Sequence, residues 1–131
     1  MKYFTIAEIA REIKLLNSKK APGYDLITPK LLQELPRKAS AAICHIYNAV
    51  TRLHYFPIEW KFAEIILILK PGKPPQETTS YRPISLLLVL SKLLERVILK
   101  RLQPLISNGN VIPKHQFGLK KETRHNNKYI T

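Results

Sequence analysis

The feature that most constrains the fold lies at the middle of the chain, where two apolar runs flank a proline-rich break. Residues 62–69 are almost all β-branched or aliphatic, which predicts a buried strand. Pro71-Gly72 and Pro74-Pro75 then end the strand, because proline fixes φ and has no N–H for a ladder. A second short strand is predicted over residues 81–86. The stretch therefore indicates a β-hairpin.

The predicted hairpin is cationic. Lys70, Lys73 and Arg82 lie on it, and Glu77 is the only acidic residue between them. A guanidinium group matches two phosphate oxygens in a bidentate fork, so Arg82 and its neighbours are candidates for binding a phosphate chain. The alternative stays open that the lysines serve only solubility and that Arg82, which precedes a proline, is a structural hydrogen-bond donor.

The net charge favours a polyanionic partner. The 131 residues include 22 Lys and Arg against 9 Asp and Glu, which gives a formal charge of +13 spread along the chain. Nucleic acid is the most plausible partner, although a ribosomal-type role or an anionic membrane surface would also suit this charge. No signal peptide or membrane span is predicted. The single Cys44 excludes an internal disulfide and favours an intracellular, reducing location, in the nucleus or cytoplasm.

Helices are predicted on both sides of the hairpin. Thr5 and Glu8 form a candidate capping box for a helix that ends near Asn17, and Thr28 with Pro29 begins a short helix over residues 30–35. A longer helix is predicted over residues 37–54 and another over 91–106. The expected apolar face of the 37–54 helix consists of Ala39, Ala42, Ile43, Ile46, Val50 and Leu53, with Cys44 as a buried thiol. The fold class is therefore α+β, mainly helical with a two-stranded antiparallel β-hairpin.

Two further groups of basic residues are candidate nucleic-acid contacts. Lys19 and Lys20 precede an Ala-Pro-Gly loop, and Lys92, Arg96 and Lys100 lie largely off the apolar stripe of the last helix. Solvated surface is the competing interpretation for both groups. The four histidines and Cys44 show no metal-ligand spacing, so no metal site is predicted.

Several blocks in this order resemble the N-terminal part of the reverse transcriptase domain of non-LTR retrotransposons, the jockey-like and LINE-like elements. The blocks are KKAPGYDLITPKLLQELP, FPIEWKFAEIILILKPGKPP, SYRPISLLLVLSKLLERVILKRL and IPKHQFGL. The resemblance implies a helical N-terminal extension over residues 1–58 and a fingers hairpin with its following basic helix over 59–119. Residues 120–131 are polar and basic and have no core pattern, which predicts a disordered tail.

The resemblance also implies roles for single residues. Arg82 and Lys70, with Lys73 as a poorer candidate, would contact the triphosphate of an incoming deoxynucleotide. The basic helix would lie near the duplex of RNA template and DNA primer, and Gln116 and Gly118 would lead towards the palm domain. The implied partners are therefore template, primer, deoxynucleoside triphosphate and the palm of the parent polypeptide, with no membrane.

The chain departs from the family pattern in two ways. After Leu119 the expected motif decays, and the palm with its Asp-containing strand and Tyr-x-Asp-Asp box is missing. The complete family enzyme would use Mg²⁺, which needs converging carboxylates, whereas this chain has the single aspartate Asp25 and scattered glutamates. We therefore expect a reverse transcriptase fragment without cofactor and without activity on its own. A stand-alone nucleic-acid-binding module or a non-functional transposon remnant are the alternatives.

Overall fold

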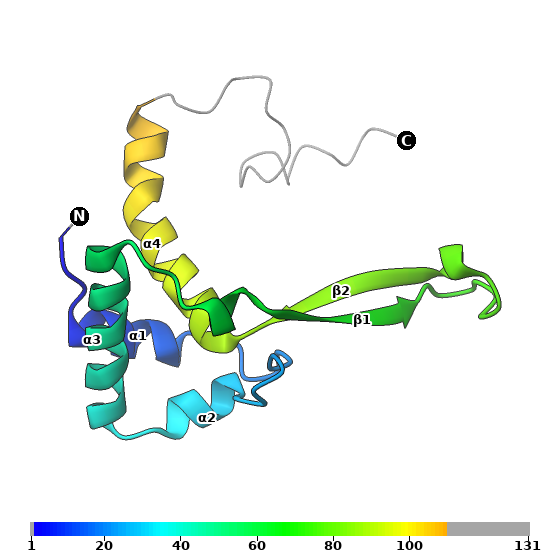
Figure 1. Ribbon diagram of the computed structural model, residues 1–131, viewed down its shortest axis with the longest axis horizontal. Helices are drawn as coiled ribbons and strands as arrows, with labels where there is room; N and C mark the ends of the chain where they lie inside the picture. Colours follow the sequence, from blue (N-terminus) through cyan, green and yellow to red (C-terminus); the bar gives the residue numbers. More distant parts are fainter. Residues whose placement is uncertain (1, 110–131) are drawn as a thin grey trace. The chain divides into compact units, whose positions relative to one another are not determined.

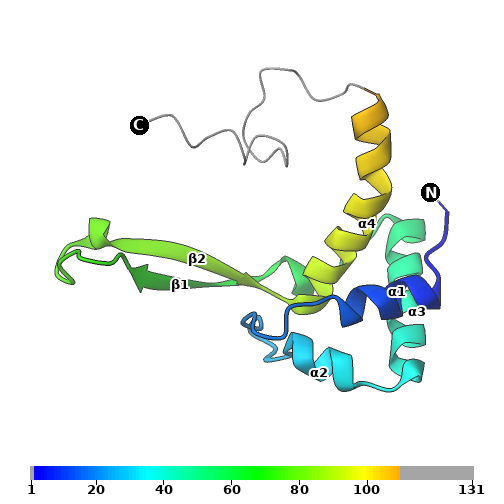
Figure 2. The same cartoon turned by 180° about the vertical axis from the view of Figure 1, so that it is seen from behind.

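A computed structural model describes residues 2–109 (Figures 1 and 2). Their elements, in chain order, are α1 (Ile6–Lys14), α2 (Pro29–Glu34), α3 (Arg37–Leu53), the 3₁₀ turn η1 (Ile58–Lys61), β1 (Ala63–Leu69), the 3₁₀ turn η2 (Thr78–Ser80), β2 (Tyr81–Leu87) and α4 (Val89–Asn108). The chain divides into two units between Val97 and Ile98, inside α4. The predicted tail over residues 120–131 lies outside the described residues.

The helix starts follow the predicted capping signals. The Thr5 hydroxyl accepts a hydrogen bond from the Glu8 N–H at 3.2 Å, and the Glu8 carboxylate accepts one from the Thr5 N–H at 3.4 Å, which completes the capping box. The Thr28 hydroxyl accepts from the Leu31 N–H at 3.1 Å, and Pro29 occupies the first turn of α2. These local bonds satisfy N–H groups that a helix start leaves without intrahelical partners.

The two strands form an antiparallel ribbon in which Leu67 faces Pro83 and Ile68 faces Arg82. The Lys70 N–H donates to the Ser80 carbonyl at 2.8 Å, so the even-numbered pairs exchange hydrogen bonds and the odd-numbered pairs do not. Pro83 belongs to an odd-numbered pair, and its missing N–H therefore removes no bond from the ribbon. The α+β class with a two-stranded antiparallel hairpin is confirmed.

The core lies among the helices and the end of β2. Helix α1 packs against both α2 and α3. The buried apolar side chains come from the segment before α1, from the four helices and from the β2–α4 junction; they are Phe4, Ile9, Ile13, Leu32, Ile43, Cys44, Tyr47, Leu88, Val89, Leu93, Leu94 and Val97. None of these buried residues belongs to β1 or β2, and Leu88 directly follows β2.

The prediction that the first strand is buried is wrong for the described part of the chain. All seven residues of β1 are exposed, with Ile65 and Leu67 at 67% and 65%. An unbroken apolar run favours burial on both faces, but here only β2 pairs with it among residues 2–109. The ribbon therefore presents apolar side chains on both of its faces.

The helix predictions needed smaller corrections. The buried residues of α3 are Ser40, Ile43, Cys44 and Tyr47, so its inward face is rotated from the predicted one, and Ile46 and Leu53 are exposed. Helix α1 ends at Lys14, earlier than predicted, and α4 begins at Val89 and continues through Pro104. None of the described helices is long and apolar enough to cross a membrane.

Candidate functional site

The candidate phosphate site is the face of the hairpin that carries Lys70 and Arg82. Successive side chains of a strand point to opposite faces, and directly paired residues share a face. Arg82 pairs with Ile68, and Lys70 follows Ile68 by two positions, so Arg82 and Lys70 lie on the same face as diagonal neighbours. Arg82 is exposed and Lys70 is half-buried. The register thus brings together the two cations that the sequence singled out.

The loop between the strands is ordered by its own hydrogen bonds. The Lys70 Nζ donates to the Thr79 carbonyl at 2.8 Å, which holds this ammonium group near the end of the ribbon. The Tyr81 hydroxyl donates to the Pro75 carbonyl at 2.9 Å. Gly72 adopts φ +72°, a conformation that glycine takes without the penalty a Cβ brings. Lys73 lies on this loop and is exposed.

The loop folds towards the face opposite Lys70 and Arg82. A shallow groove of about 270 Å³ is lined by Leu67, Tyr81 and Pro83, which share the odd-numbered face, and by loop residues 75–78. Its lining includes Glu77, the only acidic residue of the loop. Thr79 contacts both charges, since its carbonyl accepts from Lys70 Nζ at 2.8 Å and its hydroxyl donates to the Glu77 carboxylate at 3.5 Å.

The base of the hairpin is fixed by aromatic packing. Trp60, just before β1, makes edge-on ring contacts with Tyr47 of α3 and with Phe56, at 5.8 Å between centroids in each case. The Tyr47 side chain is fully buried, and its hydroxyl donates to the Leu90 carbonyl of α4 at 2.6 Å. Burial raises the pKa of Tyr47, so the phenol stays protonated as a donor. Tyr47 thereby links α3, α4 and the start of β1.

The Ala-Pro-Gly loop supports the other strand of the hairpin. Gly23 is buried, and a Cβ there would lie 2.8 Å from Leu88 Cδ2 and 2.9 Å from the Leu88 nitrogen. The Tyr24 hydroxyl donates to the Glu59 carbonyl at 3.0 Å. The glycine thus allows the loop to approach the β2–α4 junction closely.

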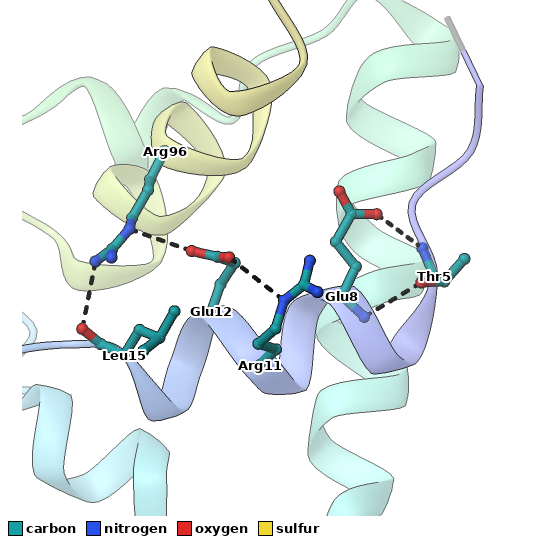
Figure 3. Close-up of polar contacts among 6 residues, drawn as sticks. All are labelled: Thr5, Glu8, Arg11, Glu12, Leu15 and Arg96. Atoms are coloured by element: carbon teal, nitrogen blue, oxygen red, sulfur yellow. Dashed lines mark hydrogen bonds and ion pairs between the residues drawn. The ribbon is translucent and has the colours of Figure 1, made fainter. Parts of the chain in front are cut away.

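Arg96 of α4 forms an ion pair with a buried carboxylate (Figure 3). Its Nε lies 3.2 Å from Glu12 Oε2, and its terminal nitrogen donates to the Leu15 carbonyl at 3.5 Å. Arg11 Nε lies 3.9 Å from the other Glu12 oxygen. The Glu12 side chain is only 1% exposed, whereas that of Arg96 is 41% exposed. The guanidinium group that the sequence offered for nucleic acid is therefore ion-paired with α1 and partly exposed.

The other candidate residues occupy separate places. Lys19 and Lys20 are exposed in a turn after α1, where the Asn17 side chain accepts a hydrogen bond from the Lys19 N–H at 2.9 Å. Lys92 is half-buried in the first turns of α4, and Lys100 is exposed further along it. Gln116 and Gly118 lie outside the described residues.

Three polar residues have structural roles that the sequence pattern did not indicate. The Gln33 amide donates to the carbonyls of Ile13, Lys14 and Leu16 and so caps the end of α1. The Asn48 side chain accepts from the Phe4 N–H at 2.7 Å and donates to the Phe4 carbonyl at 3.0 Å. Glu12 is the third. Only its place between Ile9 and Ile13 on the apolar face of α1 could have signalled that it is buried.

The described residues do not fit a magnesium site. Among residues 2–109 no three His, Cys, Asp or Glu side chains gather in a way that could hold a metal ion. The Asp25 carboxylate accepts a hydrogen bond from the Ile27 N–H at 3.1 Å in a turn, and Glu12 is paired with Arg96. No chemical step through a bound metal follows from this donor set.

The sequence is similar to several transposon-encoded polymerases from fruit flies. It is 45% identical over 121 residues to the "Probable RNA-directed DNA polymerase from transposon BS" of Drosophila melanogaster, covering 92% of the chain and 13% of that protein. It is 44% identical over 117 residues to the corresponding X-element polymerase of the same species, covering 89% and 13%. No protein-family model matches the chain.

A further relative is the "RNA-directed DNA polymerase from mobile element jockey" of Drosophila funebris, which is 43% identical over 116 residues. That alignment covers 88% of the chain and 13% of the relative. The chain thus spans about one eighth of the length of these three relatives.

Proposed function

We propose that this chain supplies the fingers of an RNA-directed DNA polymerase. It belongs to the family of such enzymes encoded by jockey-like non-LTR retrotransposons. In this proposal the hairpin β1–β2 binds the triphosphate of the incoming deoxynucleotide, through Arg82 and Lys70. Residues 1–58 form a helical extension ahead of the fingers, residues 59–119 form the fingers hairpin and its basic helix, and 120–131 follow as a basic tail.

The observation that carries the proposal is the shared face of Lys70 and Arg82. Two cations at diagonal positions of a ribbon present an ammonium and a planar guanidinium group to one ligand. Charge-assisted hydrogen bonds of this kind are about twice as strong as neutral ones, and phosphate oxygens accept them. The hydrogen bond from Lys70 to Thr79 supports this arrangement, because it restrains the ammonium group before a ligand arrives.

Helix α4 and the turn after α1 have a supporting role in this proposal. Lys92 and Lys100, together with Lys19 and Lys20, would contact the phosphate backbone of template and primer without reading sequence. Arg96 is better assigned to holding α4 against α1, because its guanidinium group pairs with Glu12.

The catalytic step is assigned to carboxylates outside residues 2–109. Two-metal phosphoryl transfer requires several acidic ligands around the ions, and the described carboxylates do not gather in this way. The chain therefore contributes binding and positioning of the nucleotide and of the duplex, while a palm domain of the polypeptide would contribute the chemistry.

A binding measurement tests the role of the hairpin. The purified chain is titrated into a fluorescein-labelled deoxynucleoside triphosphate, and fluorescence anisotropy is read at low and at moderate salt. We expect Arg82→Ala to weaken binding roughly 10–100-fold at moderate salt, because a charged hydrogen bond contributes about 1.5–3 kcal/mol. A second titration with an RNA–DNA hybrid, whose phosphate backbone the proposal assigns to lysines elsewhere, should show a smaller loss for Arg82→Ala.

Arg37→Ala provides the matched control. Arg37 is an exposed arginine at the start of α3, and its substitution removes the same charge as Arg82→Ala. We expect it to change affinity by less than about twofold at moderate salt. Equal losses for both variants would mean that only net charge binds the ligand and would contradict a site on the hairpin.

The same preparation should incorporate no nucleotide in a primer-extension assay. Templated incorporation would refute the assignment of catalysis to carboxylates outside residues 2–109.

A further inference from the structure

The outer edge of β1 is the open edge of the hairpin. Odd-numbered residues direct their N–H and C=O groups away from the partner strand, because only the even-numbered pairs exchange hydrogen bonds. Ala63, Ile65, Leu67 and Leu69 therefore present a row of backbone donors and acceptors on the outer edge of β1. Within residues 2–109 no third strand pairs with this edge.

The outer edge of β2 differs from that of β1. Pro83 lies at the centre of that edge, directly across from Leu67, and has no N–H to offer to a further strand. Proline and charge are the usual features that block an edge from pairing. Pairing is therefore blocked at one edge of the ribbon and left possible at the other.

We propose that two copies of this chain pair through their β1 edges and form a continuous four-stranded antiparallel sheet in the order β2–β1–β1–β2. Such a two-fold pairing uses the same edge on both copies, so it closes as a dimer. Each outer edge of the new sheet is then a β2 strand with its Pro83. The closed arrangement explains why proline is needed on only one of the two edges.

The charges along β1 select the register of this pairing. When Leu67 faces Leu67 of the second copy, Glu64 of each chain lies directly opposite Lys70 of the other. The intervening residues then match apolar with apolar, Ile65 with Leu69 and Ile66 with Ile68. A shift of the centre to Ile66 or Ile68 places a charged side chain opposite an apolar one. Opposite charges that face each other across strands stabilise a pair, and like charges destabilise it.

The pairing keeps Arg82 free on the phosphate-binding face, but it sets Lys70 of that face opposite Glu64 of the second copy. A two-fold axis perpendicular to the sheet keeps the even-numbered residues of both copies on one side, so Arg82 of each copy stays on the same face as Lys70. The dimer and the proposed nucleotide role therefore share Lys70, whereas only the nucleotide role uses Arg82. Arg82→Ala is expected to leave the association of the two copies unchanged.

Sedimentation equilibrium of the full chain tests the proposal. The wild-type chain should show a monomer–dimer equilibrium with no larger species. Leu67→Pro removes an outward-facing N–H without touching the bonds between β1 and β2, and it should weaken the dimer at least tenfold. Ser85→Pro makes the same change on the outer edge of β2 and is the matched control, expected to leave the dimer unchanged. Circular dichroism confirms that each variant keeps its helices.

A charge swap tests the register. Glu64→Lys and Lys70→Glu should each weaken the dimer severalfold, because each sets like charges opposite one another, and the double variant should restore it. A wild-type chain that stays monomeric throughout would overturn the proposal. Self-association that Leu67→Pro leaves unchanged would also overturn the proposal, as would a double variant that fails to restore the dimer. Either result would point to other apolar contacts or to another strand at this edge.

Discussion

At the scale of single residues, the pairing of Glu12 with Arg96 illustrates how burial decides the energetic role of a charge. The Glu12 carboxylate lies fully inside the protein, whereas the Arg96 guanidinium group keeps contact with water. An ion without its partner costs far more in the interior than at the surface, because the interior does not replace its lost hydration. Loss of the arginine should therefore be worse than neutralisation of the acid.

We predict that Arg96→Ala lowers the free energy of unfolding by about 3 kcal/mol, since it leaves the buried carboxylate without its nearest cation. Glu12→Gln should cost only about 1 kcal/mol, because the amide oxygen still accepts a hydrogen bond and Arg96 can turn towards solvent. Urea unfolding followed by circular dichroism measures both values. A larger loss of stability for Glu12→Gln than for Arg96→Ala would contradict this ranking.

At the scale of elements, the hairpin depends on the helices for its position. Its own residues are exposed along β1, so its direction is set at its base, where Trp60 packs on Tyr47 and Gly23 approaches the β2–α4 junction. The backbone of residues 87 and 88 lies within 3.0 Å of any Cβ added at position 23. Backbone atoms move less easily than side-chain ends, so this contact leaves little room for substitution.

Gly23→Ala tests this close approach. We expect it to lower the free energy of unfolding by about 1–3 kcal/mol, as is typical when a methyl group is forced into a packed site. Gly72→Ala is the control at the hairpin tip, where nothing lies within 4 Å and only the positive φ is unfavourable, at roughly 1 kcal/mol. The comparison uses thermal and urea unfolding. A smaller effect at position 23 than at position 72 would contradict the tight packing of the loop.

At the scale of the whole molecule, charge and apolar surface oppose each other. The net charge of +13 makes copies of the chain repel one another, whereas the exposed apolar ribbon draws them together. Salt screens the repulsion, because the Debye length falls to about 8 Å at physiological ionic strength. Salt also weakens the proposed ion pairs of Glu64 with Lys70, but exposed ion pairs contribute only about 0–1 kcal/mol each.

Salt should therefore act in opposite directions on the two proposed assemblies. Raising it from low to moderate concentration is expected to strengthen self-association, since screening of the net charge outweighs the loss of two exposed ion pairs. The same change is expected to weaken binding to the RNA–DNA hybrid by at least about tenfold, because counterion release contributes less. Sedimentation and anisotropy on one preparation measure both trends. Self-association that falls with salt would contradict the dominance of repulsion.

The elements and their starts were predictable because their signals are local. The hydroxyl groups of Thr5 and Thr28 bond to N–H groups three residues away, and Pro71-Gly72 ends β1 whatever surrounds it. The antiparallel register follows from a ladder between two adjacent strands, and it places Arg82 and Lys70 on one face. The sequence by itself therefore determined the starts of α1 and α2, the hairpin and the pair of candidate cations.

Only the tertiary structure decided which faces of these elements are buried. An apolar run predicts that a strand can be covered, but what covers it depends on residues distant in sequence, and for β1 the described chain supplies only β2. Likewise, Tyr47 rather than Ile46 points inward from α3, because Leu90 and Trp60 come from other elements to meet it. Arg96 forms an ion pair with Glu12 of α1, which is likewise distant from it in sequence. Local periodicity contains no information about such long-range partners, and long-range packing alone selects among the faces that the sequence allows.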